Sequence, residues 1–418
     1  MIRKFALLTL IISQLSAISQ CEDGRYRDFI FPDYIKTSDV EYGFNYDLNG
    51  AGMPLFMDIY EPLGDLEQQR PLVVLAHGGS FIGGSKEGLD IVPLCEDLAR
   101  MGYVTASIQY RLGIPITLAL EEPATEAVMR GYHDMKAAIR YFRQNAEMGG
   151  NTYAIDESKI FIGGSSAGAF IALHVAYLDE ENEIPDFLDL NQLGLTGGLE
   201  GDSGNPDYSS EVSGVFNIAG ALGDSAWVKS NDEPLCSFHG TNDETVPFGS
   251  EMLQMFGTFD VMEVDGSASV SMKAEAAGIT QCFEIYEDQG HVPHVSNIAY
   301  YDTTLSITSN FLSHLVCPEI DLDCDYRSIQ ESTSIGETNL SQLVGLAPNP
   351  AKDHVVCTIP DSWNDAFYRI YNLQGQLIES NRLTSNSTQI QTSKWAPGLY
   401  QLMIVNEDKA VTKQLIVE

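Results

Sequence analysis

A strand, a glycine-rich turn and a helix follow one another closely near the middle of the chain. The run Ile160–Ile162 is apolar, β-branched and aromatic, which is typical of a buried strand. The segment Ala167–Tyr177 then changes to helix formers with helical spacing. Only a few residues remain for the turn, so the strand must lead almost directly into the helix. This arrangement constrains the fold to one in which strands and helices alternate and pack on each other.

The same alternation continues along most of the chain. The stretch PLVVLAHGG (71–79) is nearly all apolar before its glycines, which indicates a strand buried on both faces. A helical pattern occupies Ala124–Ala146. Further strand-like runs occur at 40–46, 55–62, 104–112, 212–221, 233–240 and 281–288. Helical segments lie between the last three of these runs and after the final one. We therefore predict an α/β fold with a mainly parallel, doubly wound sheet.

The turn after Ile162 carries two adjacent serines, and the pattern around them selects one. Gly164-Ser165-Ser166-Ala167-Gly168 fits the G-x-S-x-G nucleophile elbow, which centres on Ser166 rather than Ser165. A residue on so sharp a turn needs neighbours without side chains two positions to either side, and Gly164 and Gly168 supply them. The alternative is a Gly/Ser-rich turn without chemistry.

A serine nucleophile needs a base and a group that orients the base, and both can be sought in loops that follow strands. Asp243 follows the strand-like run 233–240, with Glu244 as its rival. His291 follows the run 281–288, with His294 as its rival. The order Ser166, Asp243, His291 along the chain is the order that the α/β-hydrolase arrangement requires.

The reaction also needs hydrogen-bond donors for the oxyanion that forms on the substrate. His77-Gly78-Gly79-Ser80-Phe81 follows the apolar strand directly, and glycines there let backbone amides approach a substrate oxygen. We predict that the amides of Gly78, Gly79 and Ala167 form the oxyanion hole. The chemistry needs neither a metal nor an organic cofactor.

These motifs together resemble an α/β-hydrolase of the secreted carboxylesterase and lipase type. The landmarks are DIYEP (58–62), HGGSFIGGS (77–85), SIQYRL (107–112), GGSSAG (163–168) and HGTNDETVP (239–247), and the likeness covers roughly residues 39–316. Ser80 departs from the third glycine of the HGGG motif. The resemblance implies a serine carboxylic-ester hydrolase that acts through an acyl-enzyme.

The substrate is less constrained by the sequence than the mechanism. Short-chain, acetyl or feruloyl esters and polyesters, small or polymeric, are all compatible with the motifs. Ser80, Phe81, Ser165 and Trp227 are candidates for substrate contacts. The polar insertion at 179–211 is interpreted either as a surface loop or as a cap over the substrate entrance. The alternatives to an esterase are a serine peptidase of the prolyl-oligopeptidase type and a non-catalytic adhesion module with the same fold.

The two ends of the chain have a different character from its centre. Residues 1–19 have the charged and then apolar pattern of a secretory signal, whereas Gln20 before Cys21 disfavours a lipid anchor. The catalytic domain is expected over 20–316 and a polar linker over 317–342. Short strand-like runs over 343–418 predict a small all-β sandwich, with a carbohydrate-binding module as one alternative.

The segments LAPNPAKDHV (346–355), FYRIYNLQGQLI (367–378), APGLYQLMI (396–404) and KQLIVE (413–418) resemble the C-terminal sorting domain of the type IX secretion system of Bacteroidota. This resemblance implies a secreted or cell-surface protein that engages the secretion machinery. Beyond the signal at 1–19 no segment has the apolar length needed to span a membrane, so we expect no membrane span in the mature form.

Charge and cysteine content exclude some classes of function. The formal net charge of −36 argues against nucleic-acid binding, because a polyanion would be repelled. The seven cysteines show no zinc-type spacing, and export permits disulfides whose pairing the spacing does not reveal.

Overall fold

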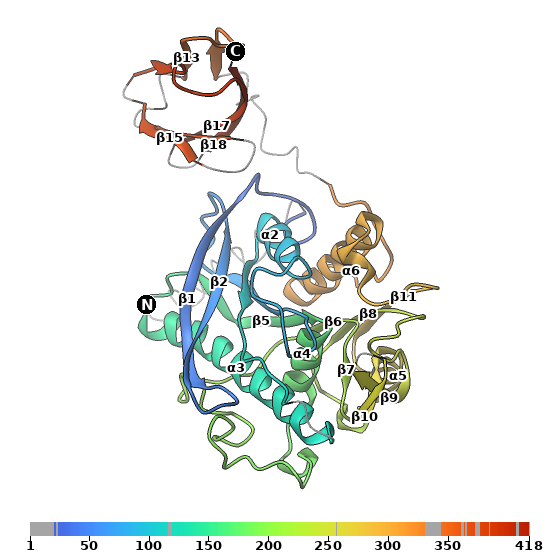
Figure 1. Ribbon diagram of the computed structural model, residues 1–418. Helices are drawn as coiled ribbons and strands as arrows, with labels where there is room; N and C mark the ends of the chain where they lie inside the picture. Colours follow the sequence, from blue (N-terminus) through green and yellow to red (C-terminus); the bar gives the residue numbers. More distant parts are fainter. Residues whose placement is uncertain are drawn as a thin grey trace, which may run out of the picture. The chain divides into compact units, whose positions relative to one another are not determined.

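A computed structural model describes residues 21, 24–115, 119–255, 257–330, 344–360, 363, 366–372, 377–383, 385–406 and 409–417. The chain divides into two compact units, Met1–Ser332 and Thr333–Glu418 (Figure 1). The signal segment expected at 1–19 lies outside the described residues. No helix within the described ranges has both the length and the hydropathy needed to cross a membrane.

An eight-stranded mixed sheet forms the centre of the first unit. In spatial order its strands are β1 (Tyr34–Tyr46), β2 (Gly52–Pro62), β4 (Val104–Ile108), β3 (Arg70–Ala76), β5 (Ile155–Ser165), β6 (Val215–Ile218), β8 (Leu235–Gly240) and β11 (Gln281–Tyr286). The β1–β2 and β2–β4 pairs are antiparallel, and all pairs from β4 to β11 are parallel. The predicted, mainly parallel α/β sheet is therefore confirmed.

Helices cover both faces of this sheet (Figure 1). They are α2 (Val92–Arg100), α3 (Glu121–Met148), α4 (Ala167–Tyr177), α5 (Ser267–Ala277) and α6 (Ile298–Val316). Successive side chains of a strand point to opposite faces, so Leu72 and Val74 of β3 pack with α3 and α4, whereas Val73 and Leu75 pack with α2 and α6. The apolar run Leu72–Ala76 of β3 is thus explained by its burial on both sides.

A second, three-stranded antiparallel sheet lies beside α5. It consists of β7 (Ala221–Leu222), β10 (Phe259–Gly266) and β9 (Ser250–Met255). The sequence interpretation expected helical material between 240 and 281, and only α5 is helical there in a regular way. In β10 the buried Val261 and Val264 flank the exposed Glu263, a pattern that suits a half-buried strand.

The insertion at 179–211 is held against α3 by buried polar contacts. Arg111 pairs with Asp134 at 2.8 Å, with both side chains fully buried, and Ser203 Oγ donates to Asp134 at 2.7 Å. Arg111 also donates to the carbonyl of Gly194 at 2.6 Å, and Arg140 to that of Glu200 at 2.7 Å. Moving this segment away would leave the buried charges of Arg111 and Asp134 without some of their partners, which is costly, so these contacts hold the segment on the helix.

Two disulfides cross-link the first unit, and one of them joins its two ends. Cys21 is bonded to Cys317 and Cys282 to Cys324. Because its sulfur is in a disulfide, Cys21 has no thiol that could carry a lipid. Arg327 pairs with Asp28 at 2.7 Å, so residues at the start of the expected linker pack on the first unit.

The second unit consists of two antiparallel sheets that share one apolar core. The first contains β12 (Gly345–Ala347), β13 (His354–Thr358) and β16 (Ser387–Gln391). The second contains β15 (Leu377–Arg382), β14 (Phe367–Asn372), β17 (Gly398–Asn406) and β18 (Lys409–Val417). Val355 and Ile390 of the first sheet pack in one cluster with Ile370 and Leu402 of the second, which confirms the predicted all-β tail.

Three aromatic residues of this tail lie in its core, whereas Phe367 is exposed and Trp395 is half-buried. Trp363, Tyr368 and Tyr400 are all buried in the same cluster. A carbohydrate-binding module of this type would need such rings on its surface, so their burial disfavours that alternative.

Candidate active site

Ser166 occupies the junction between β5 and α4, in a backbone conformation that few residues adopt. Its φ is 52° and its ψ is −118°. A Cβ at Gly168 would collide with the carbonyl oxygen of Ala76, and a Cβ at Gly164 would collide with the backbone of Gly168. The turn can therefore be this tight only with glycine at both positions, as the motif predicts.

The fold brings Ser166, His291 and Asp243 into one hydrogen-bonded line. His291 Nε2 lies 2.8 Å from Ser166 Oγ, and His291 Nδ1 lies 2.6 Å from Asp243 Oδ2. A carboxylate only accepts, so Nδ1 carries the proton that it donates to Asp243, and Nε2 is left to accept from the serine hydroxyl. This arrangement can remove the proton from Ser166 as its oxygen attacks.

Asp243 is held in its charged form by its surroundings. Burial alone would raise its pKa, but hydrogen bonds from His239 and His291, together with the backbone amide of Val246, hold the pKa well below its usual range. The Oδ1 atom accepts from the amides of Thr245 and Val246 at 2.8 and 3.0 Å. The carboxylate is therefore fixed in orientation as well as in charge.

Glu244 and His294, the alternative candidates for the acid and the base, are not part of this hydrogen-bonded line. Glu244 lines the neighbouring cavity, and none of the described hydrogen bonds joins it to His291. The ring of His294 is buried, and its Nε2 donates to the carbonyl of Asp90 at 3.1 Å. His294 therefore connects two loops of the site.

His239 is a site residue that the sequence interpretation did not single out. Its Nε2 lies 3.3 Å from Asp243 Oδ2, and its Nδ1 lies 2.7 Å from Ser267 Oγ. The signal was present in the sequence, because His239 stands at the end of a buried strand, four residues before Asp243.

The structure corrects one part of the predicted oxyanion hole. The amide of Gly78 donates to Asp90 Oδ2 at 2.6 Å, so it is not available to a substrate oxygen. The amides of Gly79 and Ala167 have no acceptor among the described hydrogen bonds. Gly79 has a φ of 122°, and a Cβ there would collide with the carbonyl of Gly83. Asp90 was missed because nothing in its local sequence marks it.

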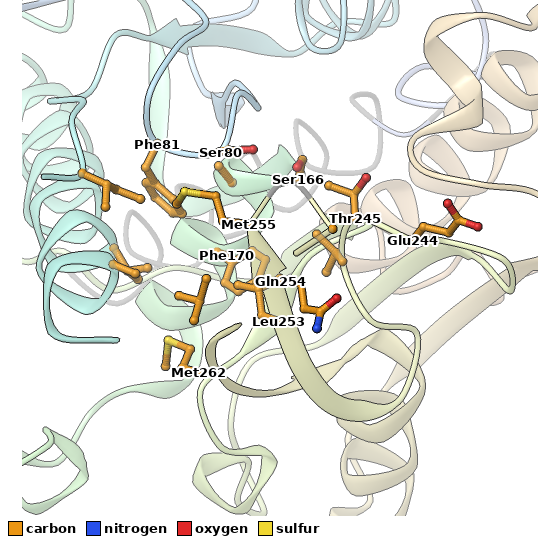
Figure 2. A pocket seen from close by; sticks show the side chains of 17 residues that line it. Ser80, Phe81, Ser166, Phe170, Glu244, Thr245, Leu253, Gln254, Met255 and Met262 are labelled. Atoms are coloured by element: carbon orange, nitrogen blue, oxygen red, sulfur yellow. The ribbon is translucent and has the colours of Figure 1, made fainter. Parts of the chain in front are cut away.

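A largely apolar cavity of about 440 Å³ opens beside Ser166 (Figure 2). Ser80 and Phe81 line it, together with Phe170, Leu253, Met255 and Met262. Ser165 does not: only 1% of it is exposed, and its hydroxyl is buried without a partner among the described residues. The expected substrate contact at Ser165 is therefore corrected.

Trp227 and the insertion border a second cavity rather than the first. This cavity has about 460 Å³ and is lined by Trp227 and by Ile184, Pro185 and Phe187 of the insertion. No residue of 179–211 lines the cavity that contains Ser166.

Comparisons with known proteins match two parts of the chain. Residues 57–194 match the family model BD-FAE, and residues 346–418 match the model of the secretion system C-terminal sorting domain. The first range includes Ser166 and ends before Asp243 and His291.

Relatives and solved structures resemble parts of the chain. A stretch of 131 residues is 32% identical to the non-reducing polyketide synthase pkbA of Emericella nidulans, and it covers 31% of this chain and 5% of that protein. Among solved structures, esterase 2 of Thermogutta terrifontis phosphorylated by paraoxon has 23% identity and a TM-score of 0.47, covering 68% of this chain and 95% of that one. The propionate-bound form has 21% identity and a TM-score of 0.46, covering 66% and 93%.

The sorting domain implies that the protein is secreted or exposed at the cell surface. The chain thus carries an esterase domain of the BD-FAE family, with the α/β-hydrolase fold, and a type IX secretion C-terminal sorting domain.

Proposed function

We propose that this protein is a secreted serine carboxylic-ester hydrolase. The observation that carries the proposal is the line of hydrogen bonds from Ser166 Oγ through His291 to Asp243, with distances of 2.8 and 2.6 Å. His291 takes the proton of Ser166 while Oγ attacks the ester carbonyl. Asp243 keeps the imidazole in the required tautomer and stabilises its cationic form.

The negative oxygen of the tetrahedral intermediate accepts hydrogen bonds from the amides of Gly79 and Ala167. Ser80, the next residue in the loop, lines the same cavity and offers a third amide. His291 then gives its proton to the leaving alcohol, and an acyl group remains on Ser166. Water, deprotonated by His291, attacks this acyl-enzyme and releases the acid.

The cavity supports a neutral, largely apolar acyl group. Phe81, Phe170 and Leu253 stand against the place where this group would lie (Figure 2). The net charge of −36 disfavours anionic substrates at a distance. Short-chain, acetyl, feruloyl and polyester substrates remain within the proposal.

The test uses the adjacent serines as a matched pair. Purified wild type, Ser166→Ala and Ser165→Ala are assayed with nitrophenyl esters from acetyl to long-chain and with a peptidyl nitroanilide. We expect ester turnover in the wild type and a loss of kcat of ~10⁴-fold or more in Ser166→Ala. Ser165→Ala should lose far less, because its hydroxyl does not line the cavity.

An equal loss in both serine variants would contradict the assignment of the nucleophile. Turnover of the anilide without the esters would favour a peptidase. Absence of all turnover in the wild type would favour the adhesion module.

A further inference from the structure

The second cavity shares part of its wall with the first. Val128, Phe170, Val261 and Met262 line both. Figure 2 shows two residues of this wall, Phe170 and Met262, and Phe170 lies between Ser166 and Met262. The two cavities are therefore adjacent, and an acyl chain that extends from Ser166 along Phe170 is directed toward their common wall.

Helix α4 sets the distance between the two cavities. Ser166, Phe170 and His174 are four residues apart, so they lie on one face of the helix. A rise of 1.5 Å per residue places His174 about 12 Å beyond Ser166 along the axis. Aromatic rings contact one another in series, with centroid distances of 6.4 Å from Phe81 to Phe170, 6.5 Å from Phe170 to His174 and 5.6 Å from His174 to Trp227.

His174 offers this second cavity a hydrogen-bond acceptor in a fixed position. Its Nδ1 donates to the carbonyl of Phe170 at 2.7 Å, which leaves the lone pair on Nε2. Only 7% of the residue is exposed, and no described hydrogen bond uses Nε2. Burial lowers the pKa of His174 to about 4, more than the bond to Phe170 raises it, so the ring is neutral at neutral pH.

The remaining charges of the second cavity favour a neutral donor over an anion. The carboxylates of Glu121 and Glu263 also line it, and both residues are exposed. They repel a carboxylate and accept from a hydroxyl. The walls around Nε2, including Trp227 and Ile184, are mostly apolar.

We propose that the second cavity binds the far end of a medium-length acyl group, and that His174 Nε2 accepts a hydrogen bond from a hydroxyl at that end. The inference rests on the proposed esterase function and deepens it. The substrate class is an ester of an ω-hydroxylated acyl chain long enough to span about 12 Å from the attacked carbonyl.

The test compares matched esters within one enzyme. We measure kcat/KM for the nitrophenyl esters of decanoic, ω-hydroxydecanoic and ω-carboxydecanoic acid. We expect the wild type to prefer the hydroxylated ester over the plain one by about 5-fold, the factor that one net hydrogen bond supplies. The carboxylated ester should be the poorest of the three.

Variants connect this preference to His174. In His174→Phe the ring is retained and the acceptor is lost, so the ratio of hydroxylated to plain ester should fall to about one. His174→Gln, whose side-chain oxygen can accept, should retain part of the ratio. His314→Gln serves as the control and should retain all of it, because His314 lines neither cavity.

A wild-type ratio near one would overturn the inference, and so would a ratio that His174→Phe leaves unchanged. In either case, ester turnover that depends on Ser166 would still support the proposed function. If no ester is turned over, calorimetric binding of ω-hydroxydecanamide and decanamide to Ser166→Ala tests the cavity alone. Tighter binding of the hydroxylated amide would support the inference, and equal binding would overturn it.

Discussion

Asp243 orients the base of the proposed mechanism, His291. Its side chain is fully buried, yet its pKa lies below the usual range because His239, His291 and the Val246 amide hydrogen bond to it. These hydrogen bonds hold the carboxylate in a single orientation. It can therefore hold the proton of His291 on Nδ1.

Replacing Asp243 by Asn should abolish most of the activity without changing the shape of the site. An amide that donates to His291 would favour the wrong tautomer, so we expect kcat for a nitrophenyl ester to fall by ~10⁴-fold. Glu244→Gln is the matched control and should lose less than about 10-fold, because Glu244 has no described bond to His291. A larger loss for Glu244→Gln than for Asp243→Asn would contradict the assignment.

Two buried histidines should make the stability of the first unit depend on pH. Burial lowers the pKa of His133 and His174 to about 4, whereas an unfolded histidine titrates near ~6.5. Below ~6.5 the unfolded chain binds more protons than the folded one, so stability falls as pH falls from ~6.5 toward 4. The contribution is on the order of 3 kcal/mol for each histidine.

The measurement is urea unfolding of the wild type, His133→Gln and His174→Gln at pH 7.5 and 5. Each variant should lose less stability than the wild type between the two pH values. Burial raises the pKa of Glu233 to about 7, so this residue makes the folded protein more stable as the pH falls. Each variant is therefore compared with the wild type, in which Glu233 has the same effect. Equal pH dependence in all three proteins would contradict the prediction.

At the scale of elements, the elbow between β5 and α4 depends on the absence of one side chain. A Cβ at Gly168 would collide with backbone atoms of Ala76 and come close to those of His77, which cannot move without shifting β3. We expect Gly168→Ala to lower the free energy of unfolding by about 3 kcal/mol or more. Urea unfolding checks this, with Gly249→Ala as the control, because a Cβ at Gly249 meets nothing within 4 Å. A loss below about 1 kcal/mol would show that the elbow relaxes.

The central elements could be predicted from the sequence because their patterns are strong. The apolar runs of β3 and β5 predict buried strands, and the long helical pattern of α3 predicts a helix. The sequence pattern of the hairpin β9–β10 does not distinguish strands from a helix, because the side chains that it buries are determined by its packing beside the first cavity. Ser166, His291 and Asp243 follow from motifs, whereas Asp90 and His239 act through contacts that only the folded loops create.

At the scale of the whole molecule, two disulfides cross-link the first unit. The pair Cys282–Cys324 closes a loop with a sequence separation of 42 residues. Cys324→Ser should lower the free energy of unfolding of the oxidised protein by about 2 to 4 kcal/mol. Urea unfolding with and without dithiothreitol measures this, and no difference between oxidised variant and wild type would contradict it. Cys357→Ser, at a free cysteine of the second unit, is the control.

The other disulfide has a consequence for damage to the chain. Cys21 and Cys317 are 296 residues apart, and Ser166, Asp243 and His291 all lie between them. The backbone and this bond together form a covalent ring around the proposed catalytic machinery. A protease outside the cell that cuts one exposed loop opens the ring without releasing either piece, so a nicked molecule keeps all three side chains tethered together.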